Sequence, residues 1–438
     1  MLGEFWLDSA PGNRLAGELD ADGGMLTVYG GELVDSMQTV QQGMVSISQP
    51  VPFDANVGYL ILGRRDDGPE VTIPFAVRLG TRHAADSVEQ DFTFLYALEG
   101  GHVARMEQYV GATVDFGEPW RSWLPGASWT GVVDLPRNDT VELTWDDGLR
   151  FEGLPSLTHD EIERSLVVPL RSLLIFLSHQ DPEPEKLVLH RATGQSEVTV
   201  KAQHGEEATQ RPFNPVVSLR AIDASRLSAW FRLADQIVPV TTVVAKTITR
   251  AGYDVEMRIL NLAASAEAIH RELYDEKLMT KEEARQIREA AVGAVPENAQ
   301  QRVAQLLQQL RNLSYSERLH RILARLDGLG VEIAGRSSDP RGDTATGTTP
   351  MHGRDLWVQS VNGARNGFAH LRRNPPEDIE RYAGQMHVLY QSLSWALTAV
   401  LLLDVGVSLD DIAADFHLSS KYSAFRQDAI QLWPEIYG

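Results

Sequence analysis

The chain is predicted to be an α+β multidomain protein, with a β-rich, sandwich-like N-terminal domain followed by an all-α helical bundle. Short alternating apolar runs, broken by Gly, Pro, Asp and Asn, fill the sequence up to about Gln203. Helical periodicity dominates from about Pro215 onward. The length of 438 residues allows two or three domains of roughly 100–200 residues each. These observations divide the chain into a β-rich domain at 1–203 and a helical domain at 215–438.

The strands of the first domain are predicted from runs of β-branched and aromatic residues between turn residues. The clearest runs are Val71–Val77, Asp91–Leu98, Thr130–Asp134, Thr140–Trp145 and Lys186–Leu189. Such runs are typical of a sandwich or a curled sheet. Ser156–His179 differs, because its apolar residues follow a helical pattern, and it is predicted to be a helix that packs on the sheet.

The helices of the second domain follow Gln203–Pro215, which is predicted to be a linker or crossover. They are predicted at Asp223–Ile237, Tyr253–Tyr274, Thr280–Val292, Glu297–Leu313, Ser314–Gly328, Arg354–Arg372, Pro376–Leu403 and Ser408–Phe416. Thr280 begins one of them as an N-cap, with acidic residues following it near the positive end of the helix dipole. Ala334–Pro350 has too little apolar content to pack and is predicted to be a mobile loop between two helices.

Composition limits the partners that this chain is expected to have. The formal net charge of −20 argues against a broad basic surface for duplex nucleic acid, although a small basic pocket is compatible with it. The absence of cysteine excludes disulfides and thiolate zinc sites, and a cytoplasmic location is expected. Met1–Trp6 lacks the features of a signal peptide, and Leu393–Val407 is shorter than the ~18–20 apolar residues that span a bilayer. No membrane partner, cofactor or metal is expected, since the sequence contains neither a P-loop nor a zinc motif.

The segment richest in chemistry is Val361–His370, which contains the string R-N-x-x-x-H formed by Arg365, Asn366 and His370. Asn366 and His370 are four residues apart, so a helix places them on one face, whereas Arg365 lies to one side. Asn374–Pro376 is predicted to end that helix. Arg365 and His370 therefore converge on one phosphate if the helix ends nearby, or if a second copy of the chain faces the first.

These residue types suffice to cleave RNA. The unperturbed histidine pKa of ~6.5 lets His370 accept a proton from a ribose 2′-hydroxyl or give one to the leaving 5′-oxygen. Arg365 keeps its charge, and its planar fork matches two non-bridging phosphate oxygens. Asn366 is predicted to fix the histidine tautomer or the phosphate through its amide. DNA lacks the 2′-hydroxyl and is not an expected substrate. A simpler interpretation stays open, in which Arg365 and His370 only cap carbonyls at the helix end.

The string resembles the signature of HEPN ribonucleases, in particular the ApeA-like branch of bacterial abortive-infection proteins. Gly3–Leu7, Leu15–Leu19 and Leu26–Gly30 are similar to the opening of the N-terminal domain that accompanies ApeA-like HEPN domains. The resemblance implies a metal-independent endoribonuclease that cleaves tRNA or another host RNA to a 2′,3′-cyclic phosphate and a 5′-hydroxyl during anti-phage abortive infection. It also implies a homodimer or higher homo-oligomer, and a β-domain that senses a phage-derived trigger or restrains the nuclease.

Three residues outside the string are candidates for the same site. Glu267 is flanked by alanines in a helix where HEPN proteins often place a polar residue, and it is predicted to orient Arg365. The alternative is a solvated glutamate. Arg372 and Arg373 lie just past the string and are predicted to hold flanking phosphates.

A basic cluster recurs at helical spacing before the predicted loop. Its members predicted to contact RNA are Arg318, Arg321 and Arg325. The alternative is a solvated face in which these cations pair with Glu317 and Asp327.

Two other classes of function also stay open. In the first, an aromatic group in the β-domain recognises a phage component or a carbohydrate, and the bundle serves only for dimerisation. That group, most of which is predicted to be core, comprises Tyr109, Phe116, Trp120, Trp123 and Trp129. In the second, the chain is a regulatory HEPN protein that keeps the fold without catalysis.

Overall fold

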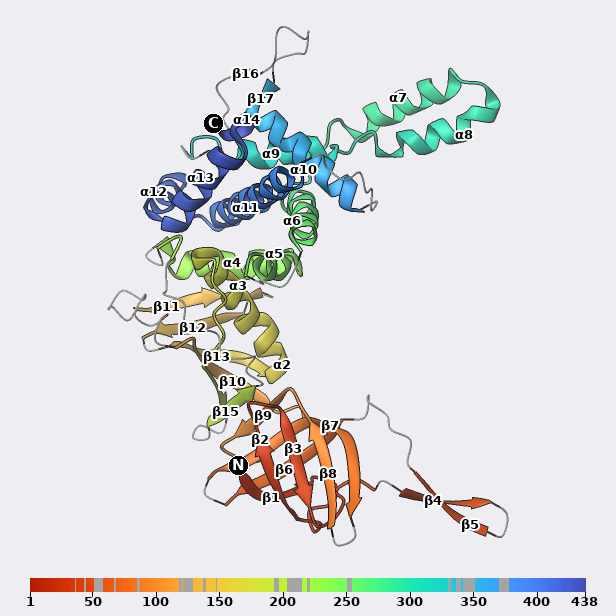
Figure 1. Cartoon of the computed structure of the whole chain (residues 1–438), viewed down its shortest axis with the longest axis vertical. Coiled ribbons are helices and arrows are strands. Elements are labelled where there is room, and N and C mark those ends of the chain that lie inside the picture. The colour runs from red at the N-terminus through yellow and green to blue at the C-terminus, as the bar shows by residue number, and fades with distance from the viewer. Residues whose placement is uncertain are drawn as a thin grey trace. The chain divides into compact units, whose positions relative to one another are not determined.

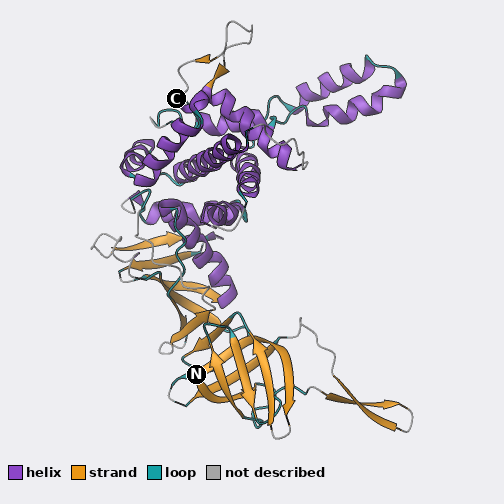
Figure 2. Cartoon of the chain, viewed as in Figure 1, coloured by secondary structure: helices purple, strands orange, loops and turns teal. Residues whose placement is uncertain are grey.

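The prediction of a β-rich domain followed by a helical domain is confirmed, since strands dominate the first part of the chain and helices the second (Figure 2). The computed structural model describes residues 1–35, 37–42, 45–50, 58–66, 68–84, 87–117, 120, 129–136, 139–146, 148–192, 197–202, 215–218, 221–249, 254–329, 332–335, 340–341, 351–369 and 378–438.

The two compact units of the chain do not follow a single cut in the sequence. The β-rich unit consists of Met1–Val133, Arg137–Val167 and Glu183–Pro212, and the helical unit of Asp134–Pro136, Val168–Pro182 and Phe213–Gly438. The helix α3 (Val168–Ser178) therefore belongs to the helical unit, although strands of the β-rich unit follow it in sequence.

The first strands close into an antiparallel barrel (Figure 1). Its members in spatial order are β6 (Tyr59–Arg65), β1 (Leu2–Leu7), β2 (Leu15–Asp20), β3 (Met25–Tyr29), β8 (Ser87–Thr93) and β7 (Glu70–Ala84). The ring closes because β7 is long: it pairs with β6 up to Ala76 and with β8 from Val77 onward, with a register shift between Arg78 and Gly80. A closed ring leaves these strands without a free edge. The β-rich domain was expected to be a sandwich or a curled sheet, and these strands form a curled sheet that closes into a barrel.

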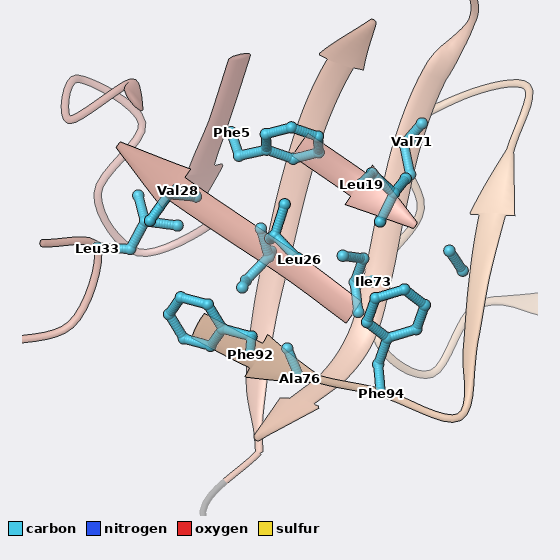
Figure 3. Close-up of a cluster of buried hydrophobic side chains, with 12 residues drawn as sticks. Phe5, Leu19, Leu26, Val28, Leu33, Val71, Ile73, Ala76, Phe92 and Phe94 are labelled. Carbon is cyan, nitrogen blue, oxygen red and sulfur yellow. The ribbon is translucent and has the colours of Figure 1, made fainter. Parts of the chain in front are cut away.

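The barrel is filled by side chains that alternate inward along each strand (Figure 3). Phe5, Leu26 and Phe92 are fully buried at its centre. The Phe5 ring occupies space that two glycines leave open: a Cβ at Gly63 or Gly17 would lie 2.5 or 2.9 Å from ring carbons. A larger residue at either glycine would displace the ring.

The sheet continues from β7 into a second set of antiparallel strands. In spatial order these are β9 (Tyr96–Glu99), β15 (Glu197–Ala202), β14 (Lys186–Arg191), β10 (Gln108–Asp115), β13 (Leu149–Thr158), β12 (Thr140–Trp145) and β11 (Trp129–Asp134). The predicted run Asp91–Leu98 forms parts of two strands, because the chain turns at Phe94 and Leu95. A separate hairpin, β4 (Met37–Gln42) with β5 (Val45–Pro50), was not predicted.

The helix predicted at Ser156–His179 begins later than expected. The residues up to Thr158 complete β13, and Thr158 caps α2 (His159–Ile162) through a reciprocal pair of contacts with Glu161. The helical path then runs through the π-helical turn η2 (Glu163–Val167) into α3.

The helical unit has more helices than the sequence predicted. Its elements after α3 are α4 (Ala224–Gln236), α5 (Val240–Thr249), α6 (Val255–Ile269), η4 (His270–Tyr274), α7 (Lys281–Gly293), α8 (Glu297–Leu306), η5 (Leu307–Gln309), α9 (Tyr315–Ala324), β16 (Pro340–Arg341), β17 (Met351–His352), α10 (Gly353–Ala369), α11 (Ile379–Asp404), α12 (Leu409–Leu418), α13 (Ser420–Leu432) and α14 (Pro434–Tyr437). The helices α5, α13 and α14 were not predicted. The β-branched residues of α5 favour a strand locally, and packing against α3 and α6 overrides that preference.

The helix α11 forms the core of this unit. By length and composition it would pass for a membrane span, yet 83% of its most apolar stretch is buried inside the protein. Trp395 on its buried face packs edge-on against Phe416 and Tyr422, with ring centroids 4.9 and 5.0 Å away. The apolar stretch Leu393–Val407, which was expected to be too short for a membrane span, begins in this buried helix. Most of the predicted loop Ala334–Pro350 lies outside the described residues.

Candidate active site

Arg365 lies near the end of α10, a helix anchored by buried residues one and two turns before it. Trp357, Val358 and Val361 are buried, and the Trp357 indole nitrogen donates a hydrogen bond of 2.6 Å to Ser392 Oγ on α11. The side chain of Arg365 is 32% exposed. The described part of α10 ends at Ala369, so His370, Arg372 and Arg373 lie outside the described residues.

Glu267 on α6 meets Arg365 across 98 residues of sequence. Arg365 Nη2 donates a hydrogen bond of 2.7 Å to Glu267 Oε2. Ala266 and Ile269 on the same helix are buried, whereas the Glu267 side chain is 29% exposed to solvent. A guanidinium held by a carboxylate has a restricted orientation, which is the geometry that the hypothesis for Glu267 requires.

Arg318 on α9 binds the second oxygen of the same carboxylate. Its Nη1 donates a hydrogen bond of 3.0 Å to Glu267 Oε1, and its side chain is only 14% exposed. Glu267 therefore bridges two arginines, one through each oxygen. Arg318 lies in the interior of this cluster, which is an unfavourable position for a direct phosphate contact.

Tyr315 completes the cluster, and the sequence did not single it out. The Arg365 guanidinium carbon lies 4.5 Å from the centre of the Tyr315 ring. The Tyr315 hydroxyl donates a hydrogen bond of 3.1 Å to the carbonyl of Ala263 on α6. Burial raises the pKa of this hydroxyl, so it stays protonated and remains a donor. In the sequence, nothing marks Tyr315 as part of a site, because a tyrosine at the start of a helix is common.

The start of α9 is fixed by a capping box. Ser314 Oγ accepts a hydrogen bond of 3.3 Å from Glu317 N, and the Glu317 carboxylate accepts one of 2.7 Å from Ser314 N. Leu319 and Ile322 are buried on the face that packs into the unit. Glu317 thus caps its own helix and makes no ion pair with a described arginine.

The other two arginines of the predicted basic cluster are also paired with acids. Arg321 Nε lies 3.2 Å from Glu276 Oε2. Arg325 forms an ion pair with Asp404 and lies 4.4 Å from the centre of the Tyr274 ring. The Arg321 side chain is 60% exposed, which leaves it the most accessible of the cluster to a phosphate.

Asn366 makes a local contact on α10. Its amide nitrogen donates a hydrogen bond of 3.2 Å to Asn362 Oδ1, one turn earlier in the helix. The structure thus brings Glu267, Arg318 and Arg365 together with Tyr315. Asn366 follows Arg365 directly on α10.

Among the described residues, no group of three or more His, Asp or Glu side chains is arranged to hold a metal ion. In the aromatic group of the β-domain, Tyr109 and Phe116 are buried, in keeping with a packing role. Trp123 and the side chain of Trp129 lie outside the described part of the chain.

Comparison with known proteins identifies the domain that contains this cluster. Residues 260–411 match the family described as Apea-like HEPN. The matched segment includes Glu267, Tyr315, Arg318 and Arg365. No curated protein and no solved structure gives a match. HEPN domains generally act as ribonucleases, typically bind RNA and dimerise, and in this branch serve anti-phage defence. Residues 260–411 of this chain therefore form an ApeA-like HEPN domain.

Proposed function

We propose that this protein is a metal-independent endoribonuclease that cleaves tRNA or another host RNA in abortive infection against phage. The observation that supports the proposal best is the Arg365 guanidinium, bound to Glu267 at 2.7 Å within the HEPN match. One of its nitrogens is engaged there, and within the described residues its other donors have no acceptor. A partly exposed cation with free donors is suited to the charge that builds on a phosphate.

The cleavage proceeds through the ribose 2′-hydroxyl. His370 accepts the proton of that hydroxyl, and the 2′-oxygen attacks the neighbouring phosphorus. The bond to the 5′-oxygen breaks, and that oxygen takes a proton from a protonated histidine. The second histidine comes from the partner copy in a homodimer, in which two R-N-x-x-x-H strings share one cleft. Arg365 and Asn366 hold the phosphate, and the products are a 2′,3′-cyclic phosphate and a 5′-hydroxyl.

The direct test uses purified protein and end-labelled tRNA. Cleavage should give fragments with a 2′,3′-cyclic phosphate, and a single 2′-deoxy substitution at the cleaved position should prevent it, because the nucleophile is then missing. Cleavage of the deoxy-substituted RNA at the same bond would contradict this mechanism.

Metal independence is a separate prediction. The R-N-x-x-x-H string supplies both a proton carrier and a fixed positive charge, so cleavage should continue at the same rate in excess EDTA. The measurement is the initial rate on an unstructured RNA, so that loss of magnesium does not unfold the substrate. A rate that falls to background in EDTA and returns with Mg²⁺ or Mn²⁺ would show that the string does not act alone.

The β-domain is proposed to restrain the nuclease until a phage-derived trigger is sensed. An unrestrained ribonuclease harms its host, and the β-rich part is larger than a support for the bundle requires. Removing this part is expected to raise His370-dependent RNA cleavage in cells without phage.

The fragment for this test must retain α3. The indole nitrogen of Trp230 donates a hydrogen bond of 2.8 Å to the carbonyl of Pro169, and the rings of Phe176 and Trp230 lie 5.5 Å apart. A fragment that begins at Pro215 would expose this core, whereas one that begins at Val168 keeps it. The comparison is the full chain against Val168–Pro182 joined to Phe213–Gly438, which omits β14 and β15 of the β-rich unit. Each is tested with and without His370→Ala, and helicity is checked by circular dichroism. Equal activity of the two, with and without phage, would refute the restraint.

A further inference from the structure

Two side-chain contacts fasten α9 to α6 at the level of Glu267. The Tyr315 hydroxyl donates to the carbonyl of Ala263 at 3.1 Å, and Arg318 Nη1 donates to Glu267 Oε1 at 3.0 Å. Residues three or four apart share one face of a helix, as Tyr315 and Arg318 do on α9 and Ala263 and Glu267 do on α6. The two contacts therefore form successive rungs between the facing sides of α9 and α6. Beside these rungs lies α10, which carries Arg365 and packs on both helices (Figure 1).

The Arg365 guanidinium is held in two directions. Its Nη2 is bound to Glu267 Oε2 at 2.7 Å, and its carbon lies 4.5 Å from the centre of the Tyr315 ring. The first contact fixes one edge of the group and the second covers one side of it. An arginine has five N–H donors in a rigid fork, so the remaining donors are presented together to a ligand.

Arg318 determines how Glu267 binds Arg365. A carboxylate and a guanidinium pair most strongly through two parallel hydrogen bonds. In this protein the pairing is single, because Arg318 engages the other oxygen of Glu267. Without Arg318, both carboxylate oxygens would be free to bind Arg365, and that pairing would engage two of the donors that a phosphate requires.

We infer that Tyr315 and Arg318 are positioning residues for Arg365, an inference that rests on the proposed ribonuclease activity. The Tyr315 ring covers one side of the Arg365 guanidinium and so limits its rotation. Arg318 engages one oxygen of Glu267, so that only the other oxygen binds Arg365. This role differs from the RNA contact predicted for Arg318 from its sequence position. The 14% exposure of the Arg318 side chain, against 32% for Arg365, is consistent with a role inside the cluster.

Kinetics distinguish positioning from RNA binding. Arg318→Gln is expected to lower kcat by about tenfold or more, because one charge-assisted contact is lost, while KM changes by less than about threefold. The salt dependence of RNA affinity should stay the same. A direct phosphate contact predicts the opposite: KM rises, kcat is unchanged, and the slope of log affinity against log salt falls by about 0.7 for a single strand. That second pattern would overturn the inference for Arg318.

Conservative variants separate positioning from a general loss of packing. Tyr315→Phe keeps the ring and should retain most of the activity, whereas Tyr315→Leu removes it and should lower kcat by about fivefold or more. Arg318→Lys keeps a cation beside Glu267 and should restore most of what Arg318→Gln loses. The matched control is Arg285→Gln, which removes an arginine paired with Glu282 at 2.6 Å on α7, a helix that contributes no residue to the cluster. If Tyr315→Leu has the kcat of the parent protein, Tyr315 does not position Arg365, and the inference for Tyr315 is overturned.

A spectroscopic readout separates this inference from the proposed function. A proton near the face of an aromatic ring resonates upfield, so the Nε–H signal of Arg365 should move when Tyr315→Leu removes the ring. The signal is identified by its absence in Arg365→Lys, and it should stay close to its parental position in Tyr315→Phe and Arg285→Gln. If the parent protein cleaves no RNA, the proposed function fails, but this shift still tests whether the Tyr315 ring holds the Arg365 guanidinium in place. An unchanged signal in Tyr315→Leu contradicts the inference in either case.

Discussion

Replacing Arg365 by alanine is expected to lower the rate of RNA cleavage by about 10²–10³-fold, the usual effect of removing a side chain that stabilises transition-state charge. His370→Ala is expected to have an effect of similar size, since proton transfer by a positioned side chain contributes about 10²–10⁴-fold. The measurement is the initial rate on labelled tRNA for each variant.

Arg365→Ala should still fold, because the substitution leaves no carboxylate without a cation. Glu267 remains paired with Arg318 at 3.0 Å after Arg365 is removed. The free energy of unfolding should therefore fall by only about 1 kcal/mol, as for a partly exposed ion pair. Circular dichroism during urea unfolding measures it.

Arg365→Lys serves as the matched control for charge. A lysine keeps the positive charge but presents a point rather than a fork, so its cleavage rate should fall between those of the parent and the alanine variant. A fully active Arg365→Ala or His370→Ala protein would show that the R-N-x-x-x-H string is not the active site.

Local sequence patterns predicted most helices of the helical unit, but they did not predict which residues of those helices are in contact. The string around Arg365 and the helix that carries Glu267 were both recognisable in the sequence, because helical period and alanine-rich flanks are local properties. The contact between Glu267 and Arg365 joins residues 98 apart. Only the likeness to HEPN proteins suggested that these two would meet.

The role of Tyr315 could not be predicted, because its signal is tertiary. A tyrosine at the start of a helix is ordinary in sequence. It becomes part of the site only where α10 brings a guanidinium to 4.5 Å from its ring. The basic cluster illustrates the same limit: Arg318 and Arg321 lie on α9 and Arg325 caps its C-terminus, yet each meets a different acid from another part of the chain.

The barrel illustrates a limit of strand prediction. Alternation predicted parts of β7 and β8, at Val71–Val77 and Asp91–Leu98, and the likeness to ApeA-like proteins covered β1, β2 and β3. Closure depends on β7, which pairs with β6 along one half and with β8 along the other. Sequence alternation specifies which side chains face inward, and it does not specify how many partners a strand has. A sandwich-like domain and a barrel therefore look alike until the pairing is known.

The largest effect on stability is expected at Trp357. This side chain is 1% exposed on α10, and its indole nitrogen donates a hydrogen bond of 2.6 Å to Ser392 Oγ on α11. Trp357→Ala should lower the free energy of unfolding of the helical unit by about 3–5 kcal/mol, because a large cavity opens and the hydrogen bond is lost. Urea unfolding followed by far-UV circular dichroism measures the change.

Two matched variants show whether this loss is specific to Trp357. Trp357→Phe keeps an aromatic ring in the core and should cost less than the alanine variant, because it leaves a smaller cavity. Leu418→Ala on α12 also removes a large apolar side chain, but that side chain is 84% exposed, so the change should stay within about 0.5 kcal/mol. Trp357 and Arg365 are on the same helix, eight residues apart, so Trp357→Ala should also weaken cleavage at urea concentrations where the parent is still folded. If Trp357→Ala unfolds at the same urea concentration as Leu418→Ala, α10 is not anchored by this side chain, and the position of Arg365 must depend on its contacts with Glu267 and Tyr315.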